Sequence, residues 1–355
     1  MSIKLLFVID GLFLGGKERQ LTEIINGLKQ YNNIQTIVIT FSKEQFYTEI
    51  VKKQVNKLYE IGYSNNFIRL MKTLKIIRSS KPDIVYSWDT MSSFFSYIST
   101  RFSNIKFVDG SIRDTGVEKG FEYQLKKFLL KNSDLVISNS FAGLKAYGVT
   151  GKVLYNAINI NRFKEQNSEE FNIIMLANFS DYKDHKTYIN ASEILAEKNL
   201  IDNIFLAGSG KHFEKYKNHI KTLPKSISSK FIFLGKVSNI ENYLLKCKIG
   251  VLCSTIKYGE GISNSILEYM AAGLIPIATD IGATNEIIIN EENGFLISEN
   301  SHQQIVSIVE NLRYDNKLIK KIKFNAINTV KNKFNYNKNI EKFVTIIKSL
   351  KNNTL

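Results

Sequence analysis

The chain has 355 residues and a formal net charge of +15, and 44% of its residues are hydrophobic and 23% are charged. These proportions are typical of globular proteins and exclude the disordered and fibrous classes, and the length suits two domains better than one core. No apolar run reaches the roughly 20 residues that a membrane-spanning helix requires.

The first residues, MSIKLLFVIDGLFLGG, predict a strand and not a signal peptide, because Asp10 interrupts the apolar stretch and no small-residue cleavage site follows. The chain has two cysteines, Cys247 and Cys253, whose spacing is typical neither of a disulfide framework nor of a zinc site. We therefore expect a protein of the reducing cytoplasm without a metal site.

In the first half of the chain, strand-like apolar runs alternate with helical patterns, including a helical segment over residues 44–60. The runs are KLLFVI, TIVITF, DIVYSW, IKFVDG and DLVISNS. This alternation predicts a parallel sheet wrapped by helices, over residues 1–163. The polar segment NINRFKEQNSEE, residues 159–170, lacks periodicity and is the expected linker.

The alternation starts again with the runs FNIIMLANFS, NIFLAGSG, KFIFLGKV, KIGVLCS and IPIATDI. A second domain is therefore expected over residues 164–334, and a final helix over residues 335–355 is expected to pack back on the first domain. The fold class is α/β, with two Rossmann-like, doubly wound parallel sheets. Ligands of such sheets bind beyond the carboxyl ends of the strands, so candidate residues are sought there.

Residues 67–81 have the pattern of a basic amphipathic helix, and a shorter candidate covers residues 123–132. Four cations recur every third residue, and apolar residues take another face. The pattern predicts contact with an anionic membrane surface; the alternatives are a helix that covers the sheet and a lysine-rich composition of the whole chain. The cations are Arg69, Lys72, Lys75 and Arg78, and the apolar residues are Leu70, Leu74 and Ile77.

A glycine loop follows the first strand, with Gly11, Gly15 and Gly16 before a helix. Glycines at that place let the backbone approach a phosphate or a sugar closely, although a plain tight turn is the alternative. The loop is not G-x-G-x-x-G, and no acid near the second strand suits a ribose, which argues against a nicotinamide cofactor.

In the second half, the loop NFSDYKDHK, residues 178–186, places Lys183 just after a strand, where an ammonium group suits a diphosphate. The alternative is a solvated surface lysine. Two further loops, residues 208–210 and 234–239, have small residues that leave room for a flat ring.

Two acids stand eight positions apart in YGEGISNSILEYMAAG, residues 258–273. Ser263 or Asn264 is a natural N-cap, which puts Glu260 in the preceding loop and Glu268 inside the helix. Carboxylates accept hydrogen bonds from hydroxyls, so the pair predicts a site for a polyhydroxylated ligand, with neutral hydroxyls and not a cation as partners. The N–H groups of residues 261–264 are expected to add donors. The alternative is a loop acid and a solvated helix residue.

Residues 258–287 strongly resemble the E-x7-E signature of retaining glycosyltransferases of family 4, also called group 1, which have the two-domain GT-B fold with a central cleft. The resemblance runs from the first strand to the last helix and includes GGKE at 15–18, VLYNAIN at 153–159 and NGFL at 293–296. It implies that Glu268 binds the ribose of a sugar nucleotide, that Glu260 with the following backbone holds the donor sugar, and that Lys183 and the glycine loop hold the diphosphate. The donor-binding residues so implied are Gly15, Gly16, Asn178, Lys183, Glu260, Gly261, Ile262, Ser263, Asn264 and Glu268.

The chain departs from the family pattern at four places. Two concern the shape of the pocket: Pro276 lies one place later than usual, and Gly282-Ala283 replaces a Gly-Gly pair. The other two concern a charge and a contact. Asn178 stands where the family has an arginine five residues before the lysine, and the usual first-domain histidine is absent, since His185 is the first histidine. Arg113 or Asp114, in FVDGSIRDTG, is the expected replacement for the lost contact, and Arg113 also suits the missing charge. The expected catalytic residues are therefore Lys183, Glu260 and Arg113.

The resemblance implies a retaining hexosyl- or N-acetylhexosaminyltransferase. The expected donor is a nucleoside-diphosphate sugar, with no cofactor and no metal, because no D-x-D motif occurs. The expected acceptor is a hydroxyl of a lipid-linked or oligosaccharide substrate in bacterial surface polysaccharide or glycoconjugate synthesis, and no nucleic acid is expected as a partner. We expect the protein in the cytoplasm, peripheral at the inner face of the membrane.

Two alternatives stay open. The first alternative to a glycosyltransferase is a non-catalytic partner that binds a sugar nucleotide or a glycan. The second is another GT-B enzyme, such as a sugar-nucleotide epimerase or a phosphorylase. Release of nucleoside diphosphate only in the presence of an acceptor argues for transfer.

Overall fold

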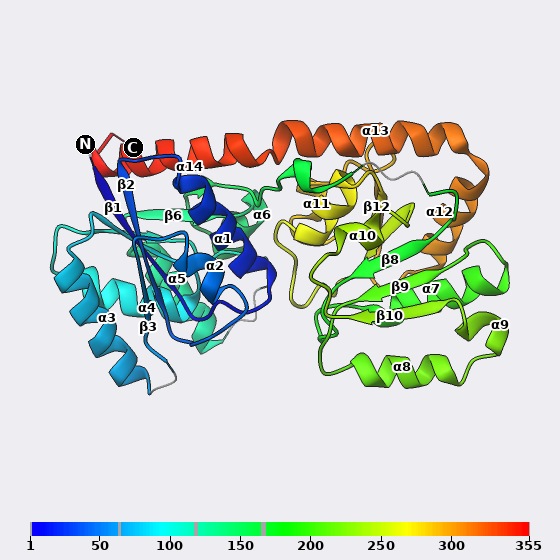
Figure 1. The fold of residues 1–355 in the computed structure, drawn as a ribbon, viewed down its shortest axis with the longest axis horizontal. Coiled ribbons are helices and arrows are strands. Elements are labelled where there is room, and N and C mark those ends of the chain that lie inside the picture. The colour runs from blue at the N-terminus through cyan, green and yellow to red at the C-terminus, as the bar shows by residue number, and fades with distance from the viewer. Residues whose placement is uncertain (1, 63–64, 117–119, 165–167, 355) are drawn as a thin grey trace. The chain divides into compact units, whose positions relative to one another are not determined.

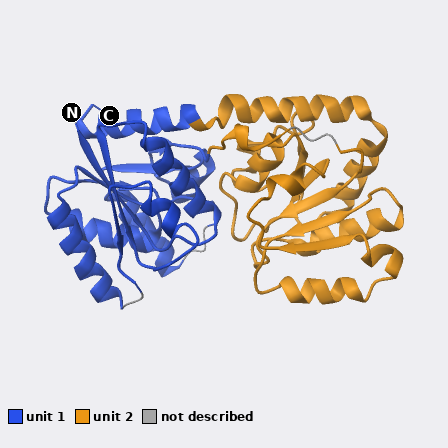
Figure 2. Ribbon diagram, viewed as in Figure 1, with its two compact units in different colours: residues 1–156, 337–355 blue, residues 157–336 orange. Residues whose placement is uncertain are grey.

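The computed structural model describes residues 2–62, 65–116, 120–164 and 168–354, which form two compact units. Unit 1 comprises residues 1–156 and 337–355, and unit 2 comprises residues 157–336 (Figure 2). The boundary expected from the sequence, between residues 163 and 164, falls within unit 2. Part of the expected linker, residues 165–167, lies outside the described residues.

Unit 1 contains, among its described residues, a seven-stranded parallel sheet in the order β3-β2-β1-β4-β5-β6-β7. Helices surround this sheet (Figure 1). The strand order changes direction between β1 and β4. Right-handed crossovers therefore put α1 and α2 on one face of the sheet and α3 to α6 on the other. The strands are β1 (Ile3–Ile9), β2 (Ile34–Thr40), β3 (Lys57–Glu60), β4 (Ile84–Ser87), β5 (Lys106–Asp109), β6 (Leu135–Ser138) and β7 (Lys152–Val153). The helices are α1 (Gly16–Leu28), α2 (Thr48–Lys52), α3 (Asn66–Ser80), α4 (Thr90–Thr100), α5 (Phe121–Lys131), α6 (Phe141–Tyr147) and the final α14 (Tyr336–Lys351).

The expected helix over residues 44–60 is wrong in its second half. α2 ends at Lys52, and Lys57–Glu60 form β3, which pairs with β2 at the end of the sheet. An edge strand of four half-buried or exposed residues has no continuous apolar run, so the sequence carried little signal for it.

Unit 2 contains, in the part of the chain that the structure describes, a six-stranded parallel sheet in the order β10-β9-β8-β11-β12-β13. Its order changes direction between β8 and β11, so this sheet is also doubly wound. The two α/β sheets expected from the sequence are thus confirmed. The strands are β8 (Ile173–Leu176), β9 (Ile204–Ala207), β10 (Phe231–Gly235), β11 (Ile249–Leu252), β12 (Ile275–Thr279) and β13 (Phe295–Ile297). The helices are α7 (His185–Glu197), α8 (Phe213–Lys221), α9 (Lys225–Ser228), α10 (Glu241–Leu244), α11 (Asn264–Ala271), α12 (His302–Tyr314) and α13 (Asn316–Lys333), with the short 3₁₀ turns η1 (Ile160–Arg162) and η2 (Thr284–Glu286).

The final helix, α14, packs on unit 1. The Phe343 ring stacks against Phe7 of β1 and Tyr86 of β4, with ring centroids 6.3 and 5.8 Å apart. At Gly27 of α1, an added Cβ would come within 2.5 Å of the Ile340 side chain, so this glycine allows α1 and α14 to approach closely. Among the described residues, no helix has the length and apolar content needed to cross a membrane.

Candidate functional site

The helix α11 is held at the carboxyl ends of β8 and β11 in unit 2. The Tyr269 hydroxyl donates a hydrogen bond to Val251 O (3.2 Å) and accepts one from Leu176 N (2.7 Å), and Ser265 Oγ donates to Leu176 O (2.7 Å). A Cβ at Gly250 would lie 2.2 Å from the Tyr269 ring, so the glycine makes room for this ring. The start of α11 therefore lies where ligands of parallel sheets bind.

The helix begins where the sequence predicted. Ser263 is the N-cap and Asn264 the first helical residue, so Glu260 lies in the loop before α11 and Glu268 within it. Gly261, Ile262 and Ser263 are buried, and Asn264 is half-buried. Glu268 is 2% exposed, which rules out the alternative of a solvated helix residue.

Lys183 and Glu260 form an ion pair beside this helix start. Lys183 Nζ also donates to Ser254 Oγ (3.2 Å), and Ser254 Oγ donates to Glu260 Oε2 (2.9 Å). The side chains of the pair are 12% and 16% exposed, so the alternative of a solvated surface lysine is wrong. The expectation that Glu260 has no cationic partner is also wrong, because the loop before α7 folds back onto the end of β11.

Backbone hydrogen bonds fasten the loops that carry this contact. Asp184 N donates to Cys253 O (3.0 Å), and Ala283 N donates to Glu260 O (2.8 Å). Ser254 N donates to Thr279 Oγ1 (3.1 Å) at the end of β12. The two charged side chains are thus positioned by three strand ends and not by one flexible loop.

Ser254 was missed in the sequence. It is the second residue after β11 and follows Cys253 directly. Its position just beyond the end of a strand could have marked it as a candidate site residue. Its hydroxyl is the bridge between Lys183 and Glu260, and the residue is 2% exposed.

The segment after β8 exposes Asn178 and buries His185. Asn178 is exposed, and its carbonyl accepts a hydrogen bond from Ser180 N (2.9 Å). The His185 ring stacks on Phe179 with centroids 3.9 Å apart, and burial lowers the pKa of His185 to about 4. His185 is therefore a neutral packing residue at neutral pH.

The glycines of residues 208–210 have a structural reason other than room for a flat ring. Gly208 has φ +143°, and a Cβ there would lie 2.0 Å from Ala177 O. Gly210 has φ +146°, and its Cβ would lie 2.5 Å from Phe179 O. The close passage of two backbone segments therefore requires both glycines.

The remaining candidates lie in unit 1. Gly15 is the N-cap of α1 and Gly16 its first residue, and a Cβ at Gly15 would lie 2.3 Å from Glu18 Oε2. Lys17 Nζ pairs with Asp10 at 2.9 Å, directly after β1. Burial raises the pKa of Glu18 to about 7. The sequence search did not select Asp10, Lys17 and Glu18 as site residues, although they adjoin the glycines that it selected.

Arg113 is half-buried against Trp88. Its guanidinium lies 3.7 Å from the Trp88 ring centroid, and its Nε donates to Gly110 O (3.0 Å). Burial lowers the pKa of Arg113. The Trp88 indole in turn donates to Lys17 O (2.8 Å), so Arg113 and the glycine loop belong to one network. Asp114 accepts a hydrogen bond from the Tyr147 hydroxyl (3.3 Å).

The structure therefore presents the candidates as two groups. Lys183 and Glu260 are in contact at the carboxyl edge of the unit 2 sheet, and Glu268 is buried in α11 of the same unit. Gly15, Gly16 and Arg113 lie in unit 1. Within the described ranges, no cluster of three or more His, Cys, Asp or Glu residues could hold a metal ion.

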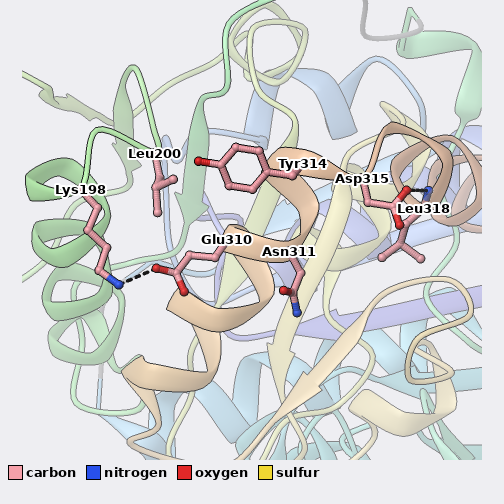
Figure 3. Close-up of a pocket in the computed structure, with 7 residues that line it drawn as sticks. All are labelled: Lys198, Leu200, Glu310, Asn311, Tyr314, Asp315 and Leu318. Atoms are coloured by element: carbon pink, nitrogen blue, oxygen red, sulfur yellow. Dashed lines mark hydrogen bonds and ion pairs between the residues drawn. The ribbon is translucent and has the colours of Figure 1, made fainter.

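A surface hollow of unit 2 lies elsewhere, where α12 meets α13 (Figure 3). Lys198 Nζ contacts Glu310 Oε1 across it at 2.5 Å, and Asp315 Oδ1 accepts a hydrogen bond from Leu318 N at the start of α13. None of the candidate residues lines it. Its lining residues are Lys198, Leu200, Glu310, Asn311, Tyr314, Asp315 and Leu318.

Residues 156–329 match the sequence model of the family described as Glycosyl transferases group 1. Uncharacterized glycosyltransferase MJ1069 of Methanocaldococcus jannaschii is 28% identical over 168 residues, which cover 47% of this chain and 41% of that protein. The UDP-Gal:alpha-D-GlcNAc-diphosphoundecaprenol alpha-1,3-galactosyltransferase of Escherichia coli is 24% identical over 310 residues, which cover 78% of this chain and 79% of that protein.

The fold is also similar to that of solved structures. The crystal structure of Anabaena HepE in complex with UDP-glucose matches with a TM-score of 0.84 and 19% identity, covering 97% of this chain and 100% of that chain. At this identity the match shows the fold alone. The GT-B fold and the family resemblance that the motifs indicated are confirmed.

Proposed function

The chain belongs, through residues 156–329, to the group 1 glycosyltransferases, and from this premise we propose that it is a retaining glycosyltransferase. It moves a hexosyl or N-acetylhexosaminyl group from a nucleoside-diphosphate sugar to a hydroxyl of a lipid-linked or oligosaccharide acceptor. The observation that carries the proposal is the contact of Lys183, Ser254 and Glu260, with Glu260 in the loop before α11 and the buried Glu268 within that helix.

Lys183 is proposed to bind the diphosphate of the donor. Its ammonium has three N–H donors, and two of them serve Ser254 Oγ and Glu260 Oε2. The third is available to a phosphate oxygen without breaking either contact. Because Lys183 is mostly buried, its charge is weakly screened by water and acts strongly on the negative charge that develops on the leaving diphosphate.

Glu260 and Glu268 are proposed to bind hydroxyls of the donor. Glu260 lies in the loop and is directed by Lys183 and Ser254, so it suits the transferred sugar, and Glu268 within α11 suits the ribose. The backbone of Gly261, Ile262, Ser263 and Asn264 is proposed to hold the same sugar. Asn178, also in unit 2, completes the proposed donor contacts of this unit.

The proposed reaction proceeds on one face of the donor sugar. The bond between the anomeric carbon and the diphosphate oxygen breaks, and the acceptor oxygen bonds to the same carbon on the same face. The acceptor proton moves to an oxygen of the departing diphosphate, so no side chain has to serve as a strong base. The protein then contributes positioning and charge stabilisation, with Lys183 as the proposed cation of unit 2 and no metal ion.

The acceptor is proposed from the relatives. The E. coli relative is named for a diphosphoundecaprenol-linked acceptor, and the present chain is proposed to act on a substrate of that kind in surface polysaccharide or glycoconjugate synthesis. A lipid-linked acceptor would keep the protein at the inner face of the cytoplasmic membrane. The donor is the nucleotide sugar itself, and no further cofactor is proposed.

The proposal is tested by incubating the full chain with UDP-glucose or UDP-galactose, with and without a diphosphoundecaprenol-linked N-acetylglucosamine acceptor. We expect UDP release only when the acceptor is present, and an anomeric centre in the product with the configuration of the donor. An inverted centre would overturn the retaining mechanism. Conversion of the sugar nucleotide without acceptor would favour an epimerase, and donor binding without turnover over a broad panel of donors and acceptors would favour a non-catalytic partner.

A further inference from the structure

The helix α3 of unit 1 exposes an apolar cluster, which consists of Phe67, Ile68 and Met71. These side chains are 70%, 40% and 48% exposed, although large apolar residues are usually buried. All three lie within five consecutive residues at the start of the helix. Scattered single apolar residues on a surface need no explanation, but such a group marks an interaction surface.

A basic cluster, which consists of Lys72, Lys75 and Arg78, is exposed on the same helix. At about 100° per residue, the apolar and basic clusters occupy one arc of roughly 140° around the helix axis. Thr73 and Ile77, both fully buried, lie on the opposite side, toward the sheet and α4. The outward face is therefore apolar in its first half and cationic in its second half.

The outward face differs from the one that the sequence predicted. The expectation that Arg69 joins the other cations is wrong, because Arg69 is half-buried and its guanidinium lies 5.7 Å from the centroid of the Phe41 ring. Phe67, Ile68 and Met71, which the three-residue cation pattern did not single out, take the exposed positions. Packing against Phe41 thus decides which side of α3 faces solvent.

We propose that this face of α3 docks on an anionic lipid bilayer, with the apolar cluster inserted among the lipid chains and the basic cluster at the phosphate groups. Charge complementarity selects this occupant, because residues 61–82 contain no Asp or Glu and the exposed cations share the arc of the apolar side chains. Interfacial helices bury their apolar face about 5–10 Å deep and place their cations at the headgroups. This inference deepens the proposed function, because it names the surface that contacts the membrane, and it rests on that function for the expectation of a lipid-linked acceptor.

The insertion is tested with the full chain and sedimented vesicles, of phosphatidylcholine alone or with an equal part of phosphatidylglycerol. We expect binding to the anionic vesicles, and a partition coefficient lower by roughly 10- to 100-fold when Phe67→Ser, Ile68→Ser and Met71→Ser are combined. Phe102→Ser is the control, because Phe102 is 98% exposed and lies outside α3, in the segment after α4. An apolar-cluster variant that binds like the parent, or a control that loses as much, would overturn the insertion.

The charge complementarity has its own test. Replacing all three residues of the basic cluster by Glu is expected to lower binding to anionic vesicles by roughly 100-fold or more, since each cation near such a surface contributes about tenfold or less. A control triple on α13 of unit 2 changes the net charge equally: Lys317→Glu, Lys320→Glu and Lys321→Glu, all at exposed positions. Equal losses in the two triples would show attraction by net charge alone and would overturn the docking face.

Both tests read vesicle binding and need no transfer activity, so their failure is distinct from failure of the proposed function. Each substituted side chain is exposed, and we expect unfolding temperatures close to that of the parent. Should the apolar triple not fold, Phe67→Ser alone, at the most exposed position of the cluster, decides the same question.

Discussion

Lys183 and Glu260, 77 residues apart in the sequence, form an ion pair at the carboxyl edge of the unit 2 sheet, and Ser254 Oγ bonds to both side chains. The contact joins the loop after β8, the end of β11 and the loop before α11. A positive group held in this way is positioned before any ligand arrives, which is the condition for strong stabilisation of a developing charge.

Removal of the ammonium is the most direct test of the proposed donor site. We expect Lys183→Ala to lower turnover by roughly 100- to 1000-fold, as is usual when a donor to a developing negative charge is lost. The matched control is Lys186→Ala, because Lys186 is an exposed lysine of the same loop-to-helix segment and should leave turnover unchanged. Similar activity of both variants would remove Lys183 from the proposed mechanism.

The bridge by Ser254 should matter for both stability and rate. Ser254→Ala leaves Lys183 and Glu260 without their shared hydroxyl, and we expect a loss of about 1–2 kcal/mol in the free energy of unfolding. Turnover should fall by less than in Lys183→Ala, because the ammonium is still present. Chemical denaturation and steady-state kinetics measure the two effects, and a stability equal to that of the parent would mean that the bridge contributes nothing.

Glu268 should govern donor affinity through the ribose. We expect Glu268→Gln to weaken binding of the nucleoside-diphosphate donor by roughly 10- to 100-fold, because a charged acceptor of hydrogen bonds is lost in a buried place. Calorimetry with a 2′,3′-dideoxy donor supplies the control, since parent and variant should bind it equally. If the variant also loses affinity for the dideoxy donor, the ribose is not the partner of Glu268.

His185 should make the protein less stable in acid. Burial lowers its pKa from 6.5 to about 4, so the unfolded chain binds a proton that the folded chain does not bind between these values. Stability is therefore complete above pH 6.5 and falls as the pH drops toward 4, by about 3 kcal/mol in total. His185→Phe keeps a ring against Phe179 and should remove this part of the slope. Parallel stability curves of parent and variant between pH 4 and 7 would contradict the assignment.

The backbone crossing at Gly208 should not tolerate a side chain. Gly208→Ala is expected to cost roughly 3 kcal/mol or more, because φ is +143° and the new Cβ would meet Ala177 O. Gly235→Ala is the matched control in the same unit, with φ +64° and open space around the Cβ, and should cost about 1 kcal/mol. Thermal unfolding of both variants measures the difference, and equal losses would show that the close approach to Ala177 does not matter.

Much of the architecture followed from local patterns. The alternation of apolar runs and helical segments indicated two doubly wound sheets, because the periods of strands and helices are properties of short stretches of backbone. Ser263 and Asn264 marked the start of α11 for the same reason, since the preference for such residues at a helix start is a property of a few consecutive positions, although the Ser263 side chain makes no capping hydrogen bond. The short edge strand β3 was missed because it carries no apolar run.

Local sequence patterns predicted the candidate site only in part. Lys183 and Glu260 were selected as separate candidates, but their contact and the bridge through Ser254 depend on β8 and β11 being neighbours, which no local pattern specifies. The burial of Glu268 and the turn of Arg69 toward Phe41 likewise depend on what packs against their helices. Periodicity, capping and family motifs reside in consecutive residues, whereas the partners of a charge and the exposed face of a helix arise when distant segments pack together.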